Sequence, residues 1–255
     1  MKKRFILFLL MFEFAGSFAQ KGRIKAEKII QKKIDHIASW AASNDYDIKY
    51  DSLEKANKDL SNYLLSITKS NPESIRWKFN IKELTIATSP DSLLRIYSWD
   101  TQTGGTMHFY KNMIQYKAGD KVGAIDINNS RDATDPGAFY KVIYLLQSNN
   151  QTYYLANYLG IGSSSDRDEG LRVFSVQNNQ LVTNIKLIRT QSGLHNSIDY
   201  WYNFFSIVDW KVRPSILYDT VKKEIKIPLV DEKGTVTKRF ITYKLTGKYF
   251  EKVKS

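Results

Sequence analysis

The acidic residues of the segment Ser163–Glu169 are the first candidates for chemistry in this sequence. The segment reads Ser-Ser-Ser-Asp-Arg-Asp-Glu and brings together Asp166, Asp168 and Glu169. Two carboxyl groups held close together can serve as the general acid and base of a hydrolase. Exposed loops between strands are normally rich in the same residue types. We expect a polar surface loop here, with a secreted hydrolase that uses these carboxylates as the alternative.

Aromatic side chains form the second candidate site. They make up 13% of the chain, and the densest run is Tyr200-Trp201-Tyr202-Asn203-Phe204-Phe205. In a strand, successive side chains of this run would point to opposite faces. Exposed Trp and Tyr rings stack on sugars, because a flat ring matches the C–H face of a pyranose, although both residue types also populate β cores. The predicted ligand-binding residues are Trp99, Tyr158, Tyr200, Trp201 and Tyr202.

Histidines and oxygen ligands form no recognisable metal or nucleophile motif. His36, His108 and His195 do not share the helix or strand spacing that would hold zinc. The chain has no cysteine and no Gly-x-Ser-x-Gly elbow. Oxygen side chains alternate from Asp126 to Asp132, as in a calcium loop, but the glycine and glutamate of the EF-hand pattern are missing. We therefore expect no metal and no cofactor, and assign no catalytic residue.

The N-terminus has the features of a cleavable export signal. Lys2, Lys3 and Arg4 precede the apolar run Phe5–Phe14, which Glu13 interrupts, and Ser17-Phe18-Ala19 has the small-x-small pattern of a signal-peptidase site. The run is about half of the roughly 20 residues that a membrane span needs. We predict cleavage after Ala19 and an exported protein, periplasmic or secreted, that does not span a membrane.

The net charge and the predicted export together limit the classes of partner that we expect. The formal net charge is +12, and removal of residues 1–19 would lower it by two. Nucleic acid is not expected as a partner, because an exported protein does not meet the cytosolic pool. Anionic surfaces suit a basic protein, although lysines spread along the whole chain could serve solubility alone. The sequence favours a non-enzymatic envelope or secreted binding protein for a carbohydrate or protein partner. A protein that occludes a toxin or an enzyme is a further alternative.

Apolar periodicity predicts a helical hairpin over residues 20–75. Ile30, Ile34 and Ile37 recur on one face of a helix expected over about Lys25–Ser43. A second helix is expected to begin at a capping box formed by Asp51 and Glu54, and to end before Pro72. Its apolar stripe consists of Leu53, Ala56, Leu60, Tyr63, Leu64 and Ile67.

Residues 76–255 have the composition of an antiparallel β domain. Short runs rich in Ile, Val, Tyr, Phe and Thr alternate with turn residues, and no long helical pattern separates them. Among the expected strands are Thr106–Tyr110, Met113–Lys117 and Leu181–Arg189. The predicted fold class is mainly β with an N-terminal helical hairpin. The strands are expected to form a meander in a barrel-like or sandwich-like sheet, with a small propeller as the alternative.

Overall fold

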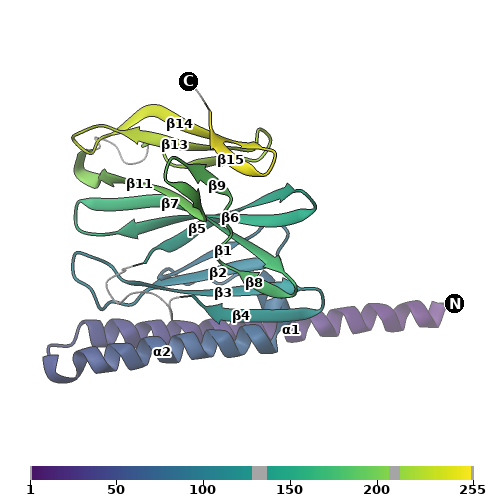
Figure 1. Cartoon of the computed structure of the whole chain (residues 1–255). Helices are drawn as coiled ribbons and strands as arrows, with labels where there is room; N and C mark the ends of the chain where they lie inside the picture. The colour runs from purple at the N-terminus through teal and green to yellow at the C-terminus, as the bar shows by residue number, and fades with distance from the viewer. Residues whose placement is uncertain (1, 128–136, 207–212, 254–255) are drawn as a thin grey trace.

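Two long helices lie side by side and form one outer layer of the protein, as a computed structural model shows for residues 2–127, 137–206 and 213–253 (Figure 1). Helix α1 spans Lys2–Ala41 and runs without a break past Ala19, and α2 spans Tyr46–Ser70. A short 3-10 helix, η1, follows at Pro72–Arg76. Among the residues that the structure describes, no helix combines the length and the apolar character needed to cross a membrane.

The apolar stripes predicted for the two helices are their contact surfaces. Ile30, Ile34 and Ile37 of α1 are buried against Leu53 and Leu60 of α2 in one hydrophobic cluster. The predicted start of the second helix is wrong, because α2 begins at Tyr46 and the proposed capping box lies inside it. No helix breaker stands between Asp45 and Asp51, so the hydrogen-bond ladder extends back by more than one turn.

The strands form three sheets in place of the single meander that the sequence suggested. Sheet A has the order β1-β2-β3-β4, with β1 Leu84–Thr88, β2 Leu94–Asp100, β3 Tyr110–Ala118 and β4 Lys121–Asp126. Sheet B has the order β11-β7-β6-β5, with β5 Phe139–Ser148, β6 Gln151–Ile161, β7 Asp166–Gln177 and β11 Ser197–Asn203, and β8 Gln180–Val182 pairs with β7. Sheet C has the order β10-β9-β15-β14-β13-β12, with β9 Ile188–Thr190, β10 Gly193–His195, β12 Leu217–Asp219, β13 Glu224–Val230, β14 Val236–Thr246 and β15 Tyr249–Lys252. A second 3-10 helix, η2, covers Phe204–Ser206.

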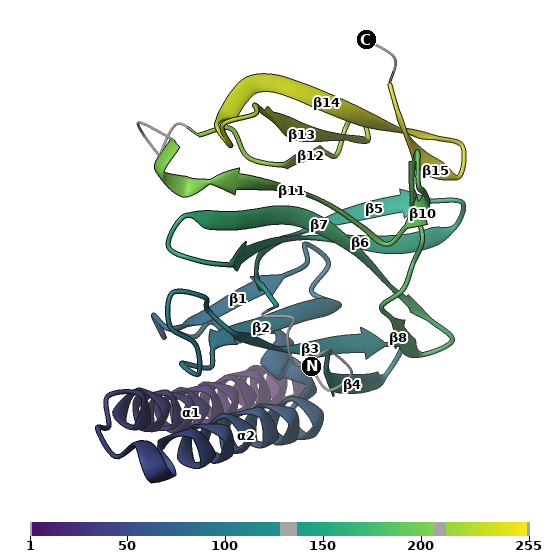
Figure 2. The same ribbon diagram turned by 60° about the vertical axis from the view of Figure 1, so that its left-hand side comes forward.

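The helices and the three sheets stack in the order helices, sheet A, sheet B, sheet C (Figures 1 and 2). Tyr97 and Trp99 of β2 face the helices, whereas Leu94 and Ile96 of the same strand face sheet B. A third cluster joins the other face of sheet B to sheet C around Leu171 and Phe250. Sheets A and B therefore each have core residues on both faces, and this stacking is sandwich-like.

Two strand predictions need correction. Thr106–Tyr110 is largely a loop, closed by a hydrogen bond from Thr101 N to Phe109 O at 2.8 Å, and β3 begins only at Tyr110. The expected strand Leu181–Arg189 is divided between β8 and β9. Strand β9 pairs with β15 in parallel, so sheet C is not wholly antiparallel. Pairing between residues this far apart in the sequence leaves no signal in local composition.

Candidate functional site

The structure separates the five predicted ligand-binding aromatics into four buried rings and one open ring. Trp99 is only 2% exposed and donates its indole N–H to Asn57 Oδ1 at 2.9 Å, between the helices and sheet A. Tyr158, Tyr200 and Tyr202 are also buried. Trp201 is 57% exposed. Burial leaves the first four without a free face for stacking, so only Trp201 can receive a sugar ring in the predicted manner.

Trp201 owes its exposure to an edge strand. β11 lies at the edge of sheet B and pairs with β7, with Trp201 opposite Asp168 and Tyr200 opposite Glu169. Tyr200 and Trp201 point to opposite faces, and this alternation is what the sequence predicted for the run. Tyr200 lies in the cluster between sheets B and C, and Trp201 lies on the other face. Gly162 lies beneath the indole, since a Cβ atom there would meet the Trp201 ring at 3.4 Å.

The three predicted loop carboxylates do not form a pair. β7 begins at Asp166, so Asp168 and Glu169 are neighbours in a strand and point to opposite faces of sheet B. Glu169 is 1% exposed and faces sheet C. Asp168 shares its face with Asp166 and Trp201. The interpretation of this segment as a loop was wrong beyond Ser165, because its polar side chains disguised the ladder with β6 and β11.

Trp201 and three carboxylates share one open face of β7 and β11, which we call the β7–β11 surface. Its residues are Asp166, Asp168, Asp199 and Trp201, and Asp199 is exposed on β11. Gly160 lets the Asp168 carboxylate lie across the sheet, since a Cβ at Gly160 would stand 1.8 Å from Asp168 Oδ1. The surface thus presents one flat aromatic ring beside several hydrogen-bond acceptors.

Tyr158 and Arg172 border this surface. Gly170 leaves room for the Tyr158 ring beside Asp199, because a Cβ there would meet Tyr158 Cζ at 2.5 Å and Asp199 Cβ at 2.8 Å. Burial and the charges of Asp199 and Asp168 raise the pKa of Tyr158, so its hydroxyl keeps its proton. The Arg172 guanidinium lies 5.6 Å from the centre of the Tyr158 ring. A phenol and a guanidinium therefore adjoin the carboxylates.

A buried polar network supports the opposite face of the same strands, and we call it the Glu169 cluster. Glu169 accepts hydrogen bonds from Tyr200 Oη at 3.0 Å and Asn157 Nδ2 at 3.3 Å, and from the Ser215 hydroxyl. Arg213 Nη2 lies 3.5 Å from Glu169 Oε2. Arg213 also donates to the Tyr202 hydroxyl and stacks on that ring at 4.1 Å.

The charges of the Glu169 cluster determine the protonation of its neighbours. Burial, followed by the Glu169 charge, raises the pKa of Tyr200. Burial raises the pKa of Tyr202 to about 12, against the opposing charge of Arg213. Burial lowers the pKa of Lys141, and Glu169 opposes that change. Glu169 has four polar partners and almost no access to solvent, which suits a structural anchor and leaves no route for substrate. Arg213 and Ser215 were not predicted from the sequence, because they are distant from Glu169 in the chain and belong to no motif.

The three histidines occupy separate places. His36 accepts the Trp40 indole N–H at 2.9 Å on α1, and His195 lies 2.9 Å from Ser192 Oγ. His108 Nδ1 lies 2.5 Å from Asp100 Oδ2, and its backbone N–H donates to Ile161 O at 3.1 Å. A carboxylate that orients an imidazole supplies two of the three members of a catalytic triad. In the part of the chain that the structure describes, no serine hydroxyl is bonded to His108 to complete one.

Metal ligation has little support in the described residues. Across residues 2–127, 137–206 and 213–253, no group of three His, Asp or Glu side chains could hold a metal ion. Asp126, the first residue of the calcium-like pattern, accepts the Ser61 hydroxyl at 3.1 Å, and residues 128–132 of that pattern lie outside the described residues. In the comparisons with known proteins, no family model matches this chain and no curated protein matches it. The geometry of the β7–β11 surface is therefore the main guide to function.

Proposed function

We propose that this is an exported, non-enzymatic binding protein that recognises carbohydrate through the β7–β11 surface. The observation that carries the proposal is Trp201, 57% exposed on an edge strand and flanked by carboxylates. The export part of the proposal rests on the N-terminal basic residues, the apolar run and the small residues before Gln20.

The arrangement suits a sugar for two reasons. An indole face covers the C–H face of a pyranose and removes apolar surface from water, while the hydroxyl groups at the sugar's edge stay solvated. Carboxylates beside the ring accept hydrogen bonds from those hydroxyl groups, and ionised acceptors form the stronger bonds. Asp168 lies directly across from Trp201 in the strand register, within reach of a sugar stacked on the indole. Three carboxylates disfavour an anionic sugar here, so we expect a neutral or amino sugar.

Binding is favoured over hydrolysis by the positions of the carboxylates. A glycosidase usually needs two carboxyl groups on either side of the scissile bond, one of them shielded so that it holds a proton. Glu169 is shielded, but it faces away from Asp168 and is engaged by four partners. Asp168 and Asp199 share the open face as diagonal neighbours, but Asp199 is exposed. The pair therefore suits recognition better than acid catalysis.

A glycan array probed with the full chain tests the proposal. We expect binding to a neutral or amino sugar, and a loss of at least tenfold in affinity for Trp201→Ala, because stacking area disappears with the ring. Tyr50→Ala is the matched control, since Tyr50 is 59% exposed on α2, in the helical layer. Thermal melting should be nearly unchanged in both variants.

Two results would count against the proposal. One is a wild-type chain that binds no glycan on the array. The other is equal binding by the wild-type chain and Trp201→Ala. Release of a shortened sugar that Asp199→Asn abolishes would favour the hydrolase over the binding protein.

A further inference from the structure

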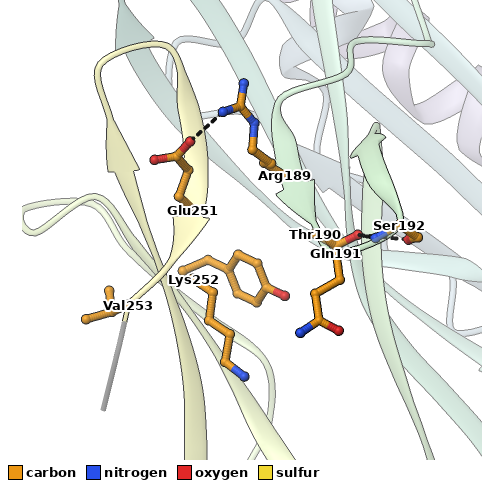
Figure 3. Close-up of a pocket in the computed structure, with 8 residues that line it drawn as sticks. Arg189, Thr190, Gln191, Ser192, Glu251, Lys252 and Val253 are labelled. Atoms are coloured by element: carbon orange, nitrogen blue, oxygen red, sulfur yellow. Dashed lines mark hydrogen bonds and ion pairs between the residues drawn. The ribbon is translucent and has the colours of Figure 1, made fainter.

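A second site lies on the β15 side of sheet C, away from η2 and the β7–β11 surface (Figures 1 and 2). It is a cavity of about 940 Å³ between the β9–β10 turn and the ends of β14 and β15. Its lining residues are Arg189, Thr190, Gln191, Ser192, Tyr243, Glu251, Lys252 and Val253 (Figure 3). The proposed carbohydrate surface shares none of these residues.

The cavity carries one positive charge more than its carboxylate can balance. Arg189 Nη1 lies 2.9 Å from Glu251 Oε1, as the dashed line in Figure 3 shows. Glu251 Oε2 accepts the Thr246 hydroxyl at 2.6 Å, so both oxygens of this carboxylate are engaged. Lys252 has no hydrogen bond or ion pair with any residue in the described part of the chain, and it is exposed. Its ammonium group is therefore available to an incoming anion.

A phenol hydroxyl stands next to this ammonium group. Tyr243 and Lys252 are cross-strand partners in β14 and β15, and such partners project to the same face of a sheet. Burial raises the pKa of Tyr243, which keeps its hydroxyl protonated and able to donate. That hydroxyl has no hydrogen-bond partner among the described residues. Two donors thus meet in one cavity.

The β9–β10 turn closes the other side with polar groups held in place. Ser192 N donates to Thr190 Oγ1 at 3.2 Å, and the two hydroxyl oxygens lie 2.9 Å apart. His195 Nε2 lies 2.9 Å from Ser192 Oγ and holds that hydroxyl in place. A turn whose side chains are bonded to one another presents a preformed wall and loses little conformational entropy when a ligand binds.

The cavity is not suited to stacking a neutral sugar. The aromatic ring that lines it, that of Tyr243, is largely buried, and the nearby Tyr249 ring is covered by the Arg189 guanidinium at 4.6 Å.

We propose that this cavity binds a small oxyanion, a carboxylate or a phosphate group, through the Lys252 ammonium and the Tyr243 hydroxyl. Arg189 stays paired with Glu251, which alternates with Lys252 in β15 and so projects to the other face, and the contacts proposed for the anion are those of Lys252 and Tyr243.

Isothermal titration calorimetry of the full chain at constant ionic strength tests this site, with inorganic phosphate and glucuronate titrated separately. We expect at least one of them to bind, and their order of affinity to distinguish phosphate from carboxylate ligands. Lys252→Gln should weaken binding about tenfold or more, because a charge-assisted hydrogen bond is lost. Tyr243→Phe should weaken it severalfold.

Lys222→Gln is the matched control, since Lys222 is an exposed lysine in the turn between β12 and β13 of the same sheet. It should bind the anion as the wild type does. The proposal is overturned if neither anion binds, or if Lys222→Gln weakens binding as much as Lys252→Gln. Circular dichroism melts identify any variant that fails to fold. If Tyr243→Phe is unstable, Lys252→Gln alone tests the proposal, because Lys252 is exposed. A neutral sugar bound at Trp201 should be unaffected by Lys252→Gln, which separates the two sites.

Discussion

Removal of the Glu169 carboxylate should destabilise the protein strongly, although the residue lies outside both proposed binding sites. Glu169 is 1% exposed, and the side chain of its partner Arg213 is 11% exposed. Glu169→Ala would leave the guanidinium without its carboxylate, in a place where Arg213 Nε already has no hydrogen-bond partner. Ser215 and Asn157 would each lose an acceptor as well.

The expected loss follows from the cost of an uncompensated buried charge. Removing one partner of a buried ion pair costs about 3–5 kcal/mol. Each kcal/mol lowers the melting temperature of a chain of this size by about 2–4 °C, so we expect Tm to fall by roughly 6–20 °C. Urea denaturation followed by circular dichroism would measure the same change in the free energy of unfolding.

A surface pair and a double variant complete this test. Glu73→Ala breaks the exposed pair with Arg76 and should cost less than about 1 kcal/mol. The double variant Glu169→Leu/Arg213→Met should be more stable than Glu169→Ala, because it leaves no buried charge behind. The reasoning is refuted if Glu169→Ala costs no more than Glu73→Ala, or if the double variant is less stable than Glu169→Ala.

Four further results are expected. Asn57→Ala should lower the free energy of unfolding, measured by urea denaturation, by about 1–3 kcal/mol, since Asn57 links α2 to Trp99 Nε1 and Thr101 O. An unchanged urea midpoint would contradict this prediction. Gly170→Ala should lower the free energy of unfolding by about 1–3 kcal/mol, because the new Cβ would overlap Tyr158. Gly247→Ala is the comparison that separates overlap from backbone strain, since no atom lies within 4 Å of a Cβ there but φ is +62°. Burial raises the pKa of Tyr202 and Tyr218 to about 12 from 10.0, so the unfolded chain loses these protons at a lower pH than the folded chain. The free energy of unfolding should therefore fall between about pH 10 and pH 12. Equal urea midpoints at pH 9 and pH 11.5 would refute this prediction. N-terminal sequencing of the exported protein should begin at Gln20, and any other first residue would move the predicted cleavage site.

Local periodicity predicted the parts of the fold in which one face of an element is buried. The stripe from Leu53 to Ile67 identified the inner face of α2, because a helix repeats every 3.6 residues whatever covers it. The same reasoning placed Tyr200 and Trp201 on opposite faces of one strand, since alternation has a period of two. The start of α2 was missed because an internal acidic residue resembled a cap.

The sequence-based prediction was wrong where polar segments are held in strands by pairing with other parts of the chain. Asp168 and Glu169 looked like loop residues, yet ladders on both sides hold them in β7. Lys111 and Asn112 lie between the expected strands Thr106–Tyr110 and Met113–Lys117, yet they continue the pairing of β3 with β2, and Asn112 Nδ2 donates to Ala138 O at 2.9 Å. Backbone hydrogen bonds to distant strands outweigh weak local preferences for turns.

The sequence by itself determined the secondary-structure class, the apolar faces of the helices and the alternation within strands, because each depends only on spacing along the chain. Tertiary structure alone decided which of those faces meets solvent. Trp99 and Trp201 both lie in strands, but β2 is covered on both sides, whereas β11 is an edge strand on which Trp201 stays exposed. Exposure depends on what packs against an element, and the covering segments come from distant parts of the chain. For that reason the sequence could propose five aromatic ligands, and only the stacking of the sheets left Trp201 as the one with an open ring.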